Sequence, residues 1–352
     1  MKVAFHSSYL GYRGTEIALM DYAQGNREIL GNESLFLMPW REGAEQHSVS
    51  RRMKEIAPLR FYRSAEEREG ILQEEKTDVF YCINNGFNDG VLSRKVPTGI
   101  HAIFRESEFH GDVYAYVSRW LSGVMAYGQA LWVPHMVRLA EEVGDLRAEF
   151  GIPGDADVLG RHGGDDSFDI PWVQKIVVET AKKRPDIWFL FLNTRKFPGA
   201  ADLPNIRFLP PTSDPVHKRR FLNSCDAMLH GRMRGETFGL SCLEFAMLGK
   251  PVMTYAGSPE CAHLEILAGK AALYHNAQEL RKLLEDRERW SESARASSKA
   301  EVHRQPAIDG QKPCGPCRIP DLKLQEYLPG AVMNKFREVF LESFNLGAKQ
   351  KD

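Results

Sequence analysis

Residues 227–255 read AMLHGRMRGETFGLSCLEFAMLGKPVMTY, and their pattern indicates the fold class. Two apolar runs, at residues 227–231 and 251–255, flank a segment with helical spacing at residues 240–248. A strand, a helix and a second strand in this order predict a right-handed βαβ unit with parallel strands. Because these runs are apolar throughout, we expect strands that helices bury on both faces.

The same alternation extends over nearly the whole chain. Helical spacing also marks residues 172–183 and 278–287. The predicted fold class is therefore α/β with doubly wound parallel sheets. A single sheet of about twelve strands would be unusually wide, so two Rossmann-like sheets are expected. Further strands are expected at residues 2–7, 34–40, 60–63, 78–84, 99–104, 131–137, 157–161, 187–193, 206–209 and 271–274.

The length of 352 residues suits two domains. The predicted boundary lies within residues 138–153, where a charged helix gives way to a turn-rich segment. We assign residues 1–140 to the first domain and residues 141–330 to the second. A C-terminal helix at about residues 331–345 is expected to pack back on the first domain. Two such domains would face each other across a cleft at the carboxyl ends of their strands, where ligands bind.

The bulk composition excludes several classes of protein. The net charge is −1, so nothing in the total calls for nucleic acid or an anionic membrane as a partner. No apolar run approaches the ~20 residues of a membrane span, and the N-terminal segment is too short for a signal peptide. We therefore expect a cytoplasmic protein without a transmembrane segment, while peripheral contact with a membrane stays open.

The six cysteines favour structural roles over metal binding or redox chemistry. Cys314 and Cys317 form a C-x-x-C pair, but no second pair accompanies them. They lie in a polar stretch rich in Ser, Pro and Gly, at residues 291–320, which indicates an irregular segment. The other four lie in apolar runs, where free cysteine acts as a small hydrophobe: Cys82, Cys225, Cys242 and Cys261.

The strongest candidate site follows the strand at residues 227–231. Gly235 and Gly239 permit tight turns and close approach of the backbone to a ligand. The N–H groups at the start of the next helix suit a phosphate. Glu236 precedes that helix and Glu244 lies within it, so the two carboxylates could accept hydrogen bonds from sugar and ribose hydroxyls. The alternative is one solvated glutamate and one that packs the helix.

A second candidate site follows the strand at residues 157–161. Arg161 ends that strand, and Gly163 and Gly164 follow it. An arginine beside a glycine turn at a strand end is well placed to bind a diphosphate. The alternative is a surface ion pair for Arg161.

Two weaker candidates lie in the first half of the chain. Gly11 and Gly14 form a flexible turn after the first strand, which could close on donor phosphates. His101 lies within an apolar strand, where a buried core histidine is the favoured interpretation from the residues alone. His110 is the runner-up as a functional histidine.

Together these segments resemble the GT-B glycosyltransferases, especially the retaining group called family 4. Residues 230–244 are similar to the E-x7-E region of that family, and residues 246–252 to the A-x-x-x-G-x-P-V segment that follows it. Residues 158–161 resemble the strand, glycine and arginine that open the second domain. Shorter matches lie at residues 11–16, 117–118 and 133–137.

The resemblance implies roles for individual residues. Glu236 would face the transferred sugar, with the backbone N–H groups of Phe238 and Gly239 close to it. Glu244 would accept hydrogen bonds from the ribose hydroxyls, and Arg161 would neutralise the departing diphosphate.

His101 matches the family histidine that contacts the sugar, which raises the functional interpretation above the core one. One departure is the absence of a lysine from residues 162–173, where the family usually has a second cation for the diphosphate. Arg232, Arg234 or Lys196 would have to supply that charge.

The expected activity is transfer of one sugar from a nucleoside diphosphate sugar, UDP- or GDP-linked, to the hydroxyl of a carbohydrate or another acceptor. Anomeric configuration would be retained, and neither a metal ion nor a cofactor would be needed. The alternatives are a sugar-nucleotide epimerase of the same fold and a catalytically inactive sugar-binding protein. A dinucleotide oxidoreductase ranks last, because the chain lacks G-x-G-x-x-G with a downstream acid.

Overall fold

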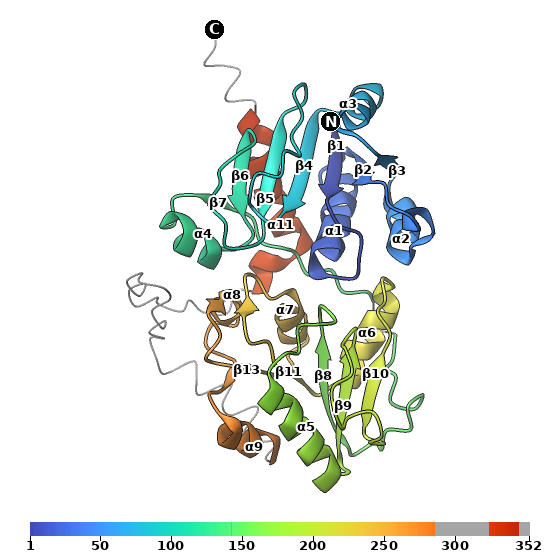
Figure 1. Cartoon of the computed structure of the whole chain (residues 1–352), viewed down its shortest axis with the longest axis vertical. Coiled ribbons are helices and arrows are strands. Elements are labelled where there is room, and N and C mark those ends of the chain that lie inside the picture. The colour runs from blue at the N-terminus through green and yellow to red at the C-terminus, as the bar shows by residue number, and fades with distance from the viewer. Residues whose placement is uncertain (142, 286–323, 345–352) are drawn as a thin grey trace. The chain divides into compact units, whose positions relative to one another are not determined.

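The chain divides into two compact units in a computed structural model that describes residues 1–141, 143–285 and 324–344 (Figure 1). Unit 1 consists of Met1–Arg138 together with the C-terminal segment that begins at Leu324. Unit 2 is Leu139–Lys323. The C-x-x-C pair at Cys314 and Cys317 and the stretch 291–320 lie outside the described residues. No described helix is long and apolar enough to span a bilayer.

Unit 1 contains a parallel sheet in the order β3-β2-β1-β4-β5-β6-β7. The chain adds β2 and β3 on one side of β1 and then places β4 to β7 on the other side. This reversal of the strand order at β1 is the doubly wound arrangement. The strands are β1 (Lys2–Ser7), β2 (Glu33–Pro39), β3 (Leu59–Tyr62), β4 (Val79–Asn84), β5 (Thr98–Ala102), β6 (Val113–Tyr116) and β7 (Leu131–Trp132). The helices are α1 (Gly14–Glu28), α2 (Ser48–Ile56), α3 (Ala65–Glu74), α4 (Arg119–Ala126) and α11 (Pro329–Arg337), with short turns at Ala44–Gln46 and Leu324–Tyr327 and a π-helical turn at Glu338–Glu342.

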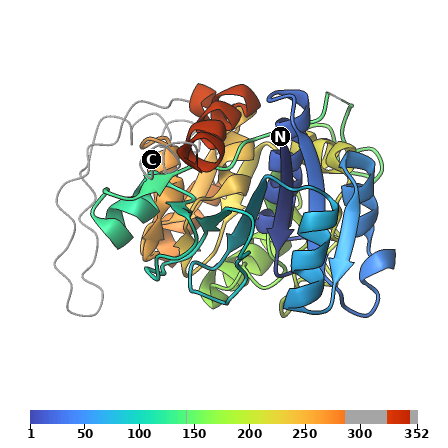
Figure 2. The same cartoon turned by 90° about the horizontal axis from the view of Figure 1, so that it is seen from above.

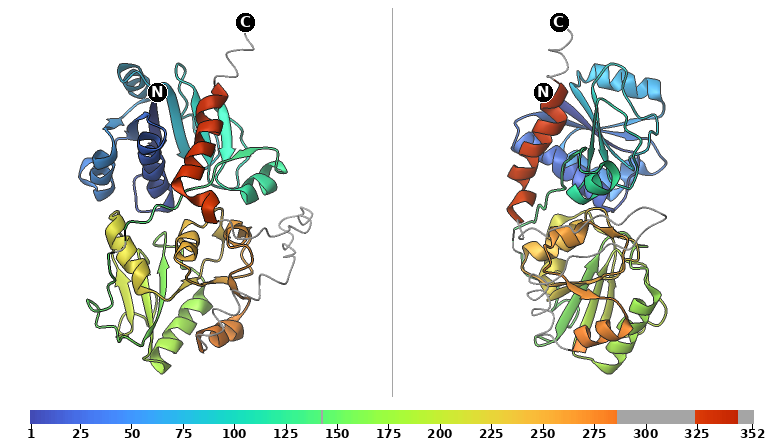
Figure 3. Two further views of the ribbon diagram at one scale, coloured as in Figure 1. Left: turned by 180° about the vertical axis from the view of Figure 1, so that it is seen from behind. Right: turned by 90° about the vertical axis from the view of Figure 1, so that its left-hand side faces the viewer.

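The C-terminal helix α11 completes one face of the unit 1 sheet. It lies beside α1 on that face, as Figures 2 and 3 show in red. Phe336 stacks on Tyr22 and Phe5 with ring centroids 5.2 and 6.1 Å away. A side chain at Gly25 would come within 2.7 Å of Met333, so a glycine at this position of α1 lets α11 approach closely.

Unit 2 contains a second parallel sheet in the order β10-β9-β8-β11-β13-β15. Its strands are β8 (Asp157–His162), β9 (Ile187–Leu192), β10 (Ile206–Leu209), β11 (Ala227–His230), β13 (Val252–Tyr255) and β15 (Ala272–Tyr274). A separate parallel pair joins β12 (Gly235–Glu236) to β14 (Glu260–Cys261). The helices are α5 (Pro171–Lys183), α6 (Pro215–Ser224), α7 (Leu240–Met247), α8 (Ala262–Ile266) and α9 (Ala277–Glu285).

Helices cover both faces of the unit 2 sheet, and alternate residues of β8 point to opposite faces. Leu159 belongs to the apolar core with α5 and α9, whereas Val158 belongs to the core with α6 and α7. Strands buried on both faces explain why the sequence shows continuous apolar runs rather than alternation.

The predicted α/β class with doubly wound parallel sheets is confirmed. Each strand expected from the sequence is present, although the run at 131–137 is a strand only at Leu131–Trp132. β6 was not expected, because its four residues lie between turn signals. The charged helix expected near residue 140 is wrong, since residues 139–141 and 143–150 form extended and turn structure.

Candidate functional site

The loops that follow β8 and β11 leave the same edge of the unit 2 sheet. Met228 of β11 pairs with Gly160 of β8 in a parallel register, so both strands end at that edge. The predicted donor-site residues of unit 2 lie on these two loops and on α7, the helix after β11. The structure therefore brings together the two stretches that the sequence singled out in this unit.

Glu236 is a partly buried carboxylate held by two basic side chains. Its Oε2 atom lies 2.7 Å from Nη1 of Arg232, and its Oε1 atom lies 3.2 Å from Nε2 of His230. Burial raises the pKa of Glu236, but the hydrogen bond from His230 and the charge of Arg232 outweigh it and lower the pKa to about 2. Glu236 is therefore an anion at neutral pH, and 19% of its side chain is exposed.

Glu244 is a deeply buried carboxylate with a different pair of partners. Nζ of Lys218, on α6, lies 2.5 Å from its Oε1 atom. Nε2 of His162, the last residue of β8, lies 2.9 Å from its Oε2 atom. Burial opposes ionisation, yet Lys218 and His162 lower the pKa of Glu244 to about 2.

Two glycines shape the turn between these carboxylates. Gly235 and Gly239 have φ angles of 78° and 96°, in the region that other residues rarely adopt. A side chain at Gly235 would overlap the carbonyl oxygen of Glu260, and one at Gly239 would come within 2.6 Å of His263. Gly239 is the N-cap of α7, so Glu244 lies about 6 Å along the helix axis from the first helical residue. Phe238, just before that cap, is 4% exposed.

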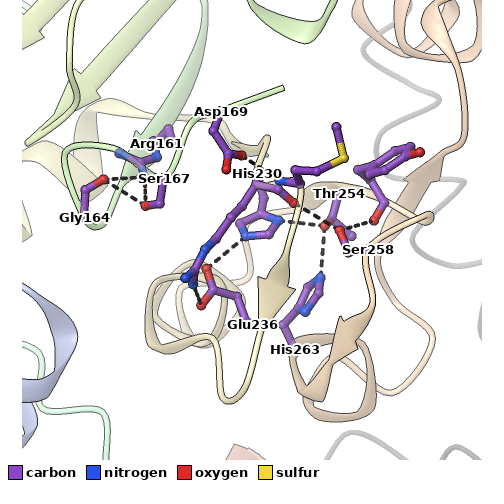
Figure 4. A network of polar contacts seen from close by, with 12 residues as sticks. Arg161, Gly164, Ser167, Asp169, His230, Glu236, Thr254, Ser258 and His263 are labelled. Atoms are coloured by element: carbon purple, nitrogen blue, oxygen red, sulfur yellow. Dashed lines mark hydrogen bonds and ion pairs between the residues drawn. The ribbon is translucent and has the colours of Figure 1, made fainter. Parts of the chain in front are cut away.

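The guanidinium of Arg161 forms hydrogen bonds with neighbouring groups of the protein. Arg161 is 3% exposed, and its guanidinium donates to Oγ1 of Thr194 at 2.5 Å, to the carbonyl of Asn193 at 3.3 Å and to the carbonyl of Gly164 at 2.9 Å. It also donates to the hydroxyl of Ser167 (Figure 4). Burial lowers the pKa of Arg161 to about 10, so it stays charged. These contacts fix the turn after β8 and take up both terminal nitrogens.

The residue that links β8 to Glu244 is His162 and not Arg161. The two are consecutive in β8, so their side chains leave opposite faces of the sheet. Gly163 lies in the turn between them and α5, and its carbonyl accepts a hydrogen bond from Asn193 at 2.7 Å. Neither His162 nor Lys218 was singled out in the sequence. His162 could have been found from its place at a strand end, whereas the contact of Lys218 depends on tertiary structure.

The other basic residues considered for the diphosphate have varied surroundings. Arg232 contacts Glu236, and Nε of Arg234 lies 2.7 Å from Glu260. Lys196 is exposed. Asp165 pairs with Arg195 at 3.0 Å, so this acidic side chain of the β8 turn has a cation of its own.

The candidate residues of unit 1 lie in two settings. Gly11 and Gly14 are in the loop between β1 and α1, where Gly14 begins the helix. Neither has a positive φ angle, and a side chain at Gly14 would meet nothing within 4 Å. Geometry alone therefore does not demand glycine at Gly14.

The two candidate histidines of unit 1 differ in burial. His101 is fully buried among aromatic rings, with Nδ1 2.6 Å from the hydroxyl of Tyr81 and Nε2 2.9 Å from the carbonyl of Val133. Both ring nitrogens are thus engaged, which favours the core-histidine alternative over sugar contact. His110 is partly exposed, and its Nδ1 atom lies 2.6 Å from the carbonyl of Glu108.

Within the described residues, no group of three or more His, Cys, Asp or Glu side chains is arranged to hold a metal ion. Cys82, Cys225 and Cys242 are buried as free thiols, and Cys261 is partly buried.

Comparison with known proteins gives structural relatives only. No protein-family model and no curated protein matches the chain. Among solved structures, Anabaena HepE in complex with UDP-glucose has a TM-score of 0.66 at 13% identity, over 99% of this chain and 100% of that one. A glycosyltransferase from Rickettsia africae has a TM-score of 0.62 at 11% identity, over 97% and 98% of the two chains. UDP-GlcNAc 2-epimerase from Neisseria meningitidis, bound to UDP-GlcNAc, has a TM-score of 0.60 at 12% identity, over 97% and 100%. At these identities the likeness establishes the shared GT-B fold.

Proposed function

We propose that this protein is a glycosyltransferase that moves a sugar from a nucleoside diphosphate sugar, UDP- or GDP-linked, to an acceptor hydroxyl. The observation that carries the proposal is a pair of ionised carboxylates, the partly buried Glu236 before α7 and the buried Glu244 within it. Carboxylates accept hydrogen bonds from hydroxyl groups, which sugars and ribose supply. Solved relatives in complex with UDP or UDP-glucose support a donor of this class.

The two carboxylates take different parts in the proposal. Glu236, with 19% of its side chain exposed, would face the transferred sugar beside the backbone of Phe238 and Gly239. Glu244 would bind the ribose. Its side chain is only 2% exposed, so ribose hydroxyls would take the place of part of its contact with Lys218 or His162.

Charge on the departing diphosphate would be stabilised by the start of α7 and by the β8 turn. The amide dipoles of a helix N-terminus favour an anion. Arg161 would contribute mainly by holding the Gly163–Gly164 turn in place, since its terminal nitrogens already bind that turn and the segment after β9. Transfer would proceed with retention of configuration and without a metal ion.

Thermal unfolding with UDP-, GDP-, dTDP- and ADP-linked sugars tests donor binding. A donor at 100 times its Kd should stabilise the protein by about 2.7 kcal/mol through mass action. E244A should lose most of the shift, whereas E236A should keep it and lose about 100- to 1000-fold in kcat, as expected when one preorganised electrostatic contact is removed. An unchanged shift in E244A, or unchanged turnover in E236A, would contradict the assigned roles.

A sugar-nucleotide epimerase is the second candidate, because epimerases occur among the structural relatives. Proton NMR of the donor alone separates the two. An epimerase changes the sugar of the nucleotide in this sample. A transferase changes it only when an acceptor is added, and a proton spectrum of that product reports its anomeric configuration. Donor binding without either reaction would indicate an inactive sugar-binding protein.

A further inference from the structure

A chain of hydrogen bonds runs from Glu236 into the core of unit 2 (Figure 4). Nε2 of His230 lies 3.2 Å from Oε1 of Glu236, and Nδ1 of the same ring lies 2.8 Å from Oγ1 of Thr254. Nε2 of His263 lies 3.1 Å from that hydroxyl oxygen. His230 and Thr254 are paired neighbours on β11 and β13, and His263 lies on α8. His230 is 3% exposed, and Thr254 and His263 are fully buried.

The protons of this chain have one consistent arrangement, which begins at the carboxylate. An ionised carboxylate only accepts hydrogen bonds, so Nε2 of His230 carries a proton and donates it to Glu236. In a neutral imidazole the other nitrogen is then an acceptor. In the neutral form of His230, Nδ1 therefore accepts from the hydroxyl of Thr254.

The arrangement continues to His263. The only hydroxyl proton of Thr254 is directed at His230, so its oxygen accepts from Nε2–H of His263. Burial, together with the neighbouring His230, lowers the pKa of His263 to about 3, so this ring is neutral. Its Nδ1 atom then carries no proton, and it has no hydrogen-bond partner among the residues that the structure describes.

The reverse arrangement is disfavoured. If Nδ1 of His230 carried the proton and donated to Thr254, the hydroxyl would have to donate to Nε2 of His263. The neutral His263 ring would then hold its proton on Nδ1, for which the described part of the chain offers no acceptor. A buried N–H group without an acceptor costs about 1–3 kcal/mol. The carboxylate of Glu236 and the surroundings of His263 thus both favour the proton on Nε2 of His230.

We propose that Thr254 and His263 are positioning residues for Glu236, because they hold His230 in the tautomer whose Nε2–H group binds the carboxylate. Without the Thr254 hydroxyl, only Glu236 favours the proton on Nε2, so the tautomer with the proton on Nδ1 should become more populated, and its bare Nε2 would repel Glu236. The carboxylate would then lose its contact with His230 and keep, among the described residues, its contact with Arg232. The effect on catalysis rests on the proposed function, whereas the tautomer does not.

The test compares T254V with T254S in the full chain. We expect T254V to lower kcat by about 10- to 100-fold, the usual effect of removing a partner that orients a functional side chain. The KM for the donor should change far less, and T254S, which keeps the hydroxyl, should restore kcat. The 15N shifts of His230, assigned by comparison with H230Q, should show a single Nε2–H tautomer in the wild type and a mixture in T254V.

A matched control and a second pair of variants complete the experiment. Thr77 is a buried threonine of unit 1 whose hydroxyl has no partner within residues 1–141, 143–285 and 324–344. T77V should therefore match the wild type in kcat and in the His230 shifts. If T254V does not fold, H263M and H263Q repeat the comparison, since only the glutamine side chain retains an N–H donor.

Three results would overturn the proposal: an Nδ1–H tautomer of His230 in the wild type, unchanged kcat in T254V, or lowered kcat with an unchanged tautomer. If the wild type neither binds nor converts a nucleotide sugar, the proposed function fails. The 15N shifts then decide the tautomer by themselves, so the two failures are distinguishable.

Discussion

Glu16 of unit 1 and Glu244 of unit 2 occupy similar places but differ in charge. Each lies in a helix that follows a strand of a parallel sheet, and each is almost completely buried, at 2% and 1% exposure. The pKa of Glu16 is raised to about 7, whereas that of Glu244 is lowered to about 2. Two glutamates with equal burial therefore differ at neutral pH: one titrates and the other is a permanent anion.

The difference lies in the partners. Glu244 contacts Lys218 at 2.5 Å and His162 at 2.9 Å, which outweighs the cost of burial. For Glu16 burial is the largest effect, and the opposing contacts are weaker: its own backbone N–H, the hydroxyl of Ser7 at 3.2 Å and the charge of Arg13. Burial sets the size of the penalty, and the neighbouring charge decides whether the carboxyl ionises.

The largest expected effect comes from removing the cation beside Glu244. K218M should lower the free energy of unfolding by about 3–5 kcal/mol at pH 7, because it leaves a buried carboxylate without its main partner. The stabilisation by ionised Glu244 is present above pH 4.5, its ordinary pKa, and is lost as the pH falls toward 2. The difference between K218M and the wild type should therefore shrink in acid.

Urea unfolding at pH 7 and pH 3 measures this effect. Lys175 gives the matched control, since its pair with Glu179 is exposed and 3.9 Å long, and K175M should cost less than about 1 kcal/mol. Equal losses for K218M and K175M would show that Glu244 does not depend on Lys218.

The second effect has the opposite sign and concerns Glu16. Because its folded pKa lies above 4.5, the wild type is progressively destabilised as the pH rises from about 4.5 through 7. E16Q removes the charge, so it should be more stable than the wild type by up to about 3 kcal/mol at pH 8 and nearly equal to it at pH 4. Unfolding curves at both pH values check this, with E45Q, an exposed site, as the control. A gain that is independent of pH would refute the raised pKa.

The smallest expected effect is the difference in stability between alanine substitutions at Gly239, before α7, and at Gly14, at the start of α1. G239A should cost about 1–3 kcal/mol, because Gly239 has a φ angle of 96° and its added methyl group would press on His263. G14A should instead gain about 0.4–1 kcal/mol, since Gly14 lies in open space at the start of α1. Thermal unfolding of both variants measures the contrast, and equal effects would mean that the two loops tolerate side chains alike.

The sequence predicted the two sheets well because their strands are buried on both faces. Runs such as residues 187–192 are apolar throughout, and this signal does not depend on distant parts of the chain. β6 was missed, because a four-residue run between turns carries too little periodicity. The helix expected near residue 140 failed although Leu139, Leu146 and Phe150 have helical spacing, because Gly144 has a φ angle of 72°, which a right-handed helix does not contain.

The candidate site was predicted in part, for a physical reason. The Glu236–Glu244 span and its glycines are local, so their spacing is visible in the sequence. Lys218 and His162, which contact Glu244, and Thr254, which contacts His230, come from other elements and become neighbours only in the folded unit. Arg161 illustrates the same limit. Its place near the end of a strand is visible in the sequence, but the contacts of its side chain with Thr194 and Ser167 are not.

The position of α11 has a consequence for how the chain acquires its structure during synthesis. Phe336 and Phe340 cover Tyr81 and His101 in unit 1, although more than 230 residues of chain separate these two pairs. During translation the sheet of unit 1 leaves the ribosome first, whereas Phe336 and Phe340, which cover one of its faces, leave last. The first unit to leave the ribosome therefore keeps an open apolar face while the whole of unit 2 is being made, so it is the later unit that can finish folding first.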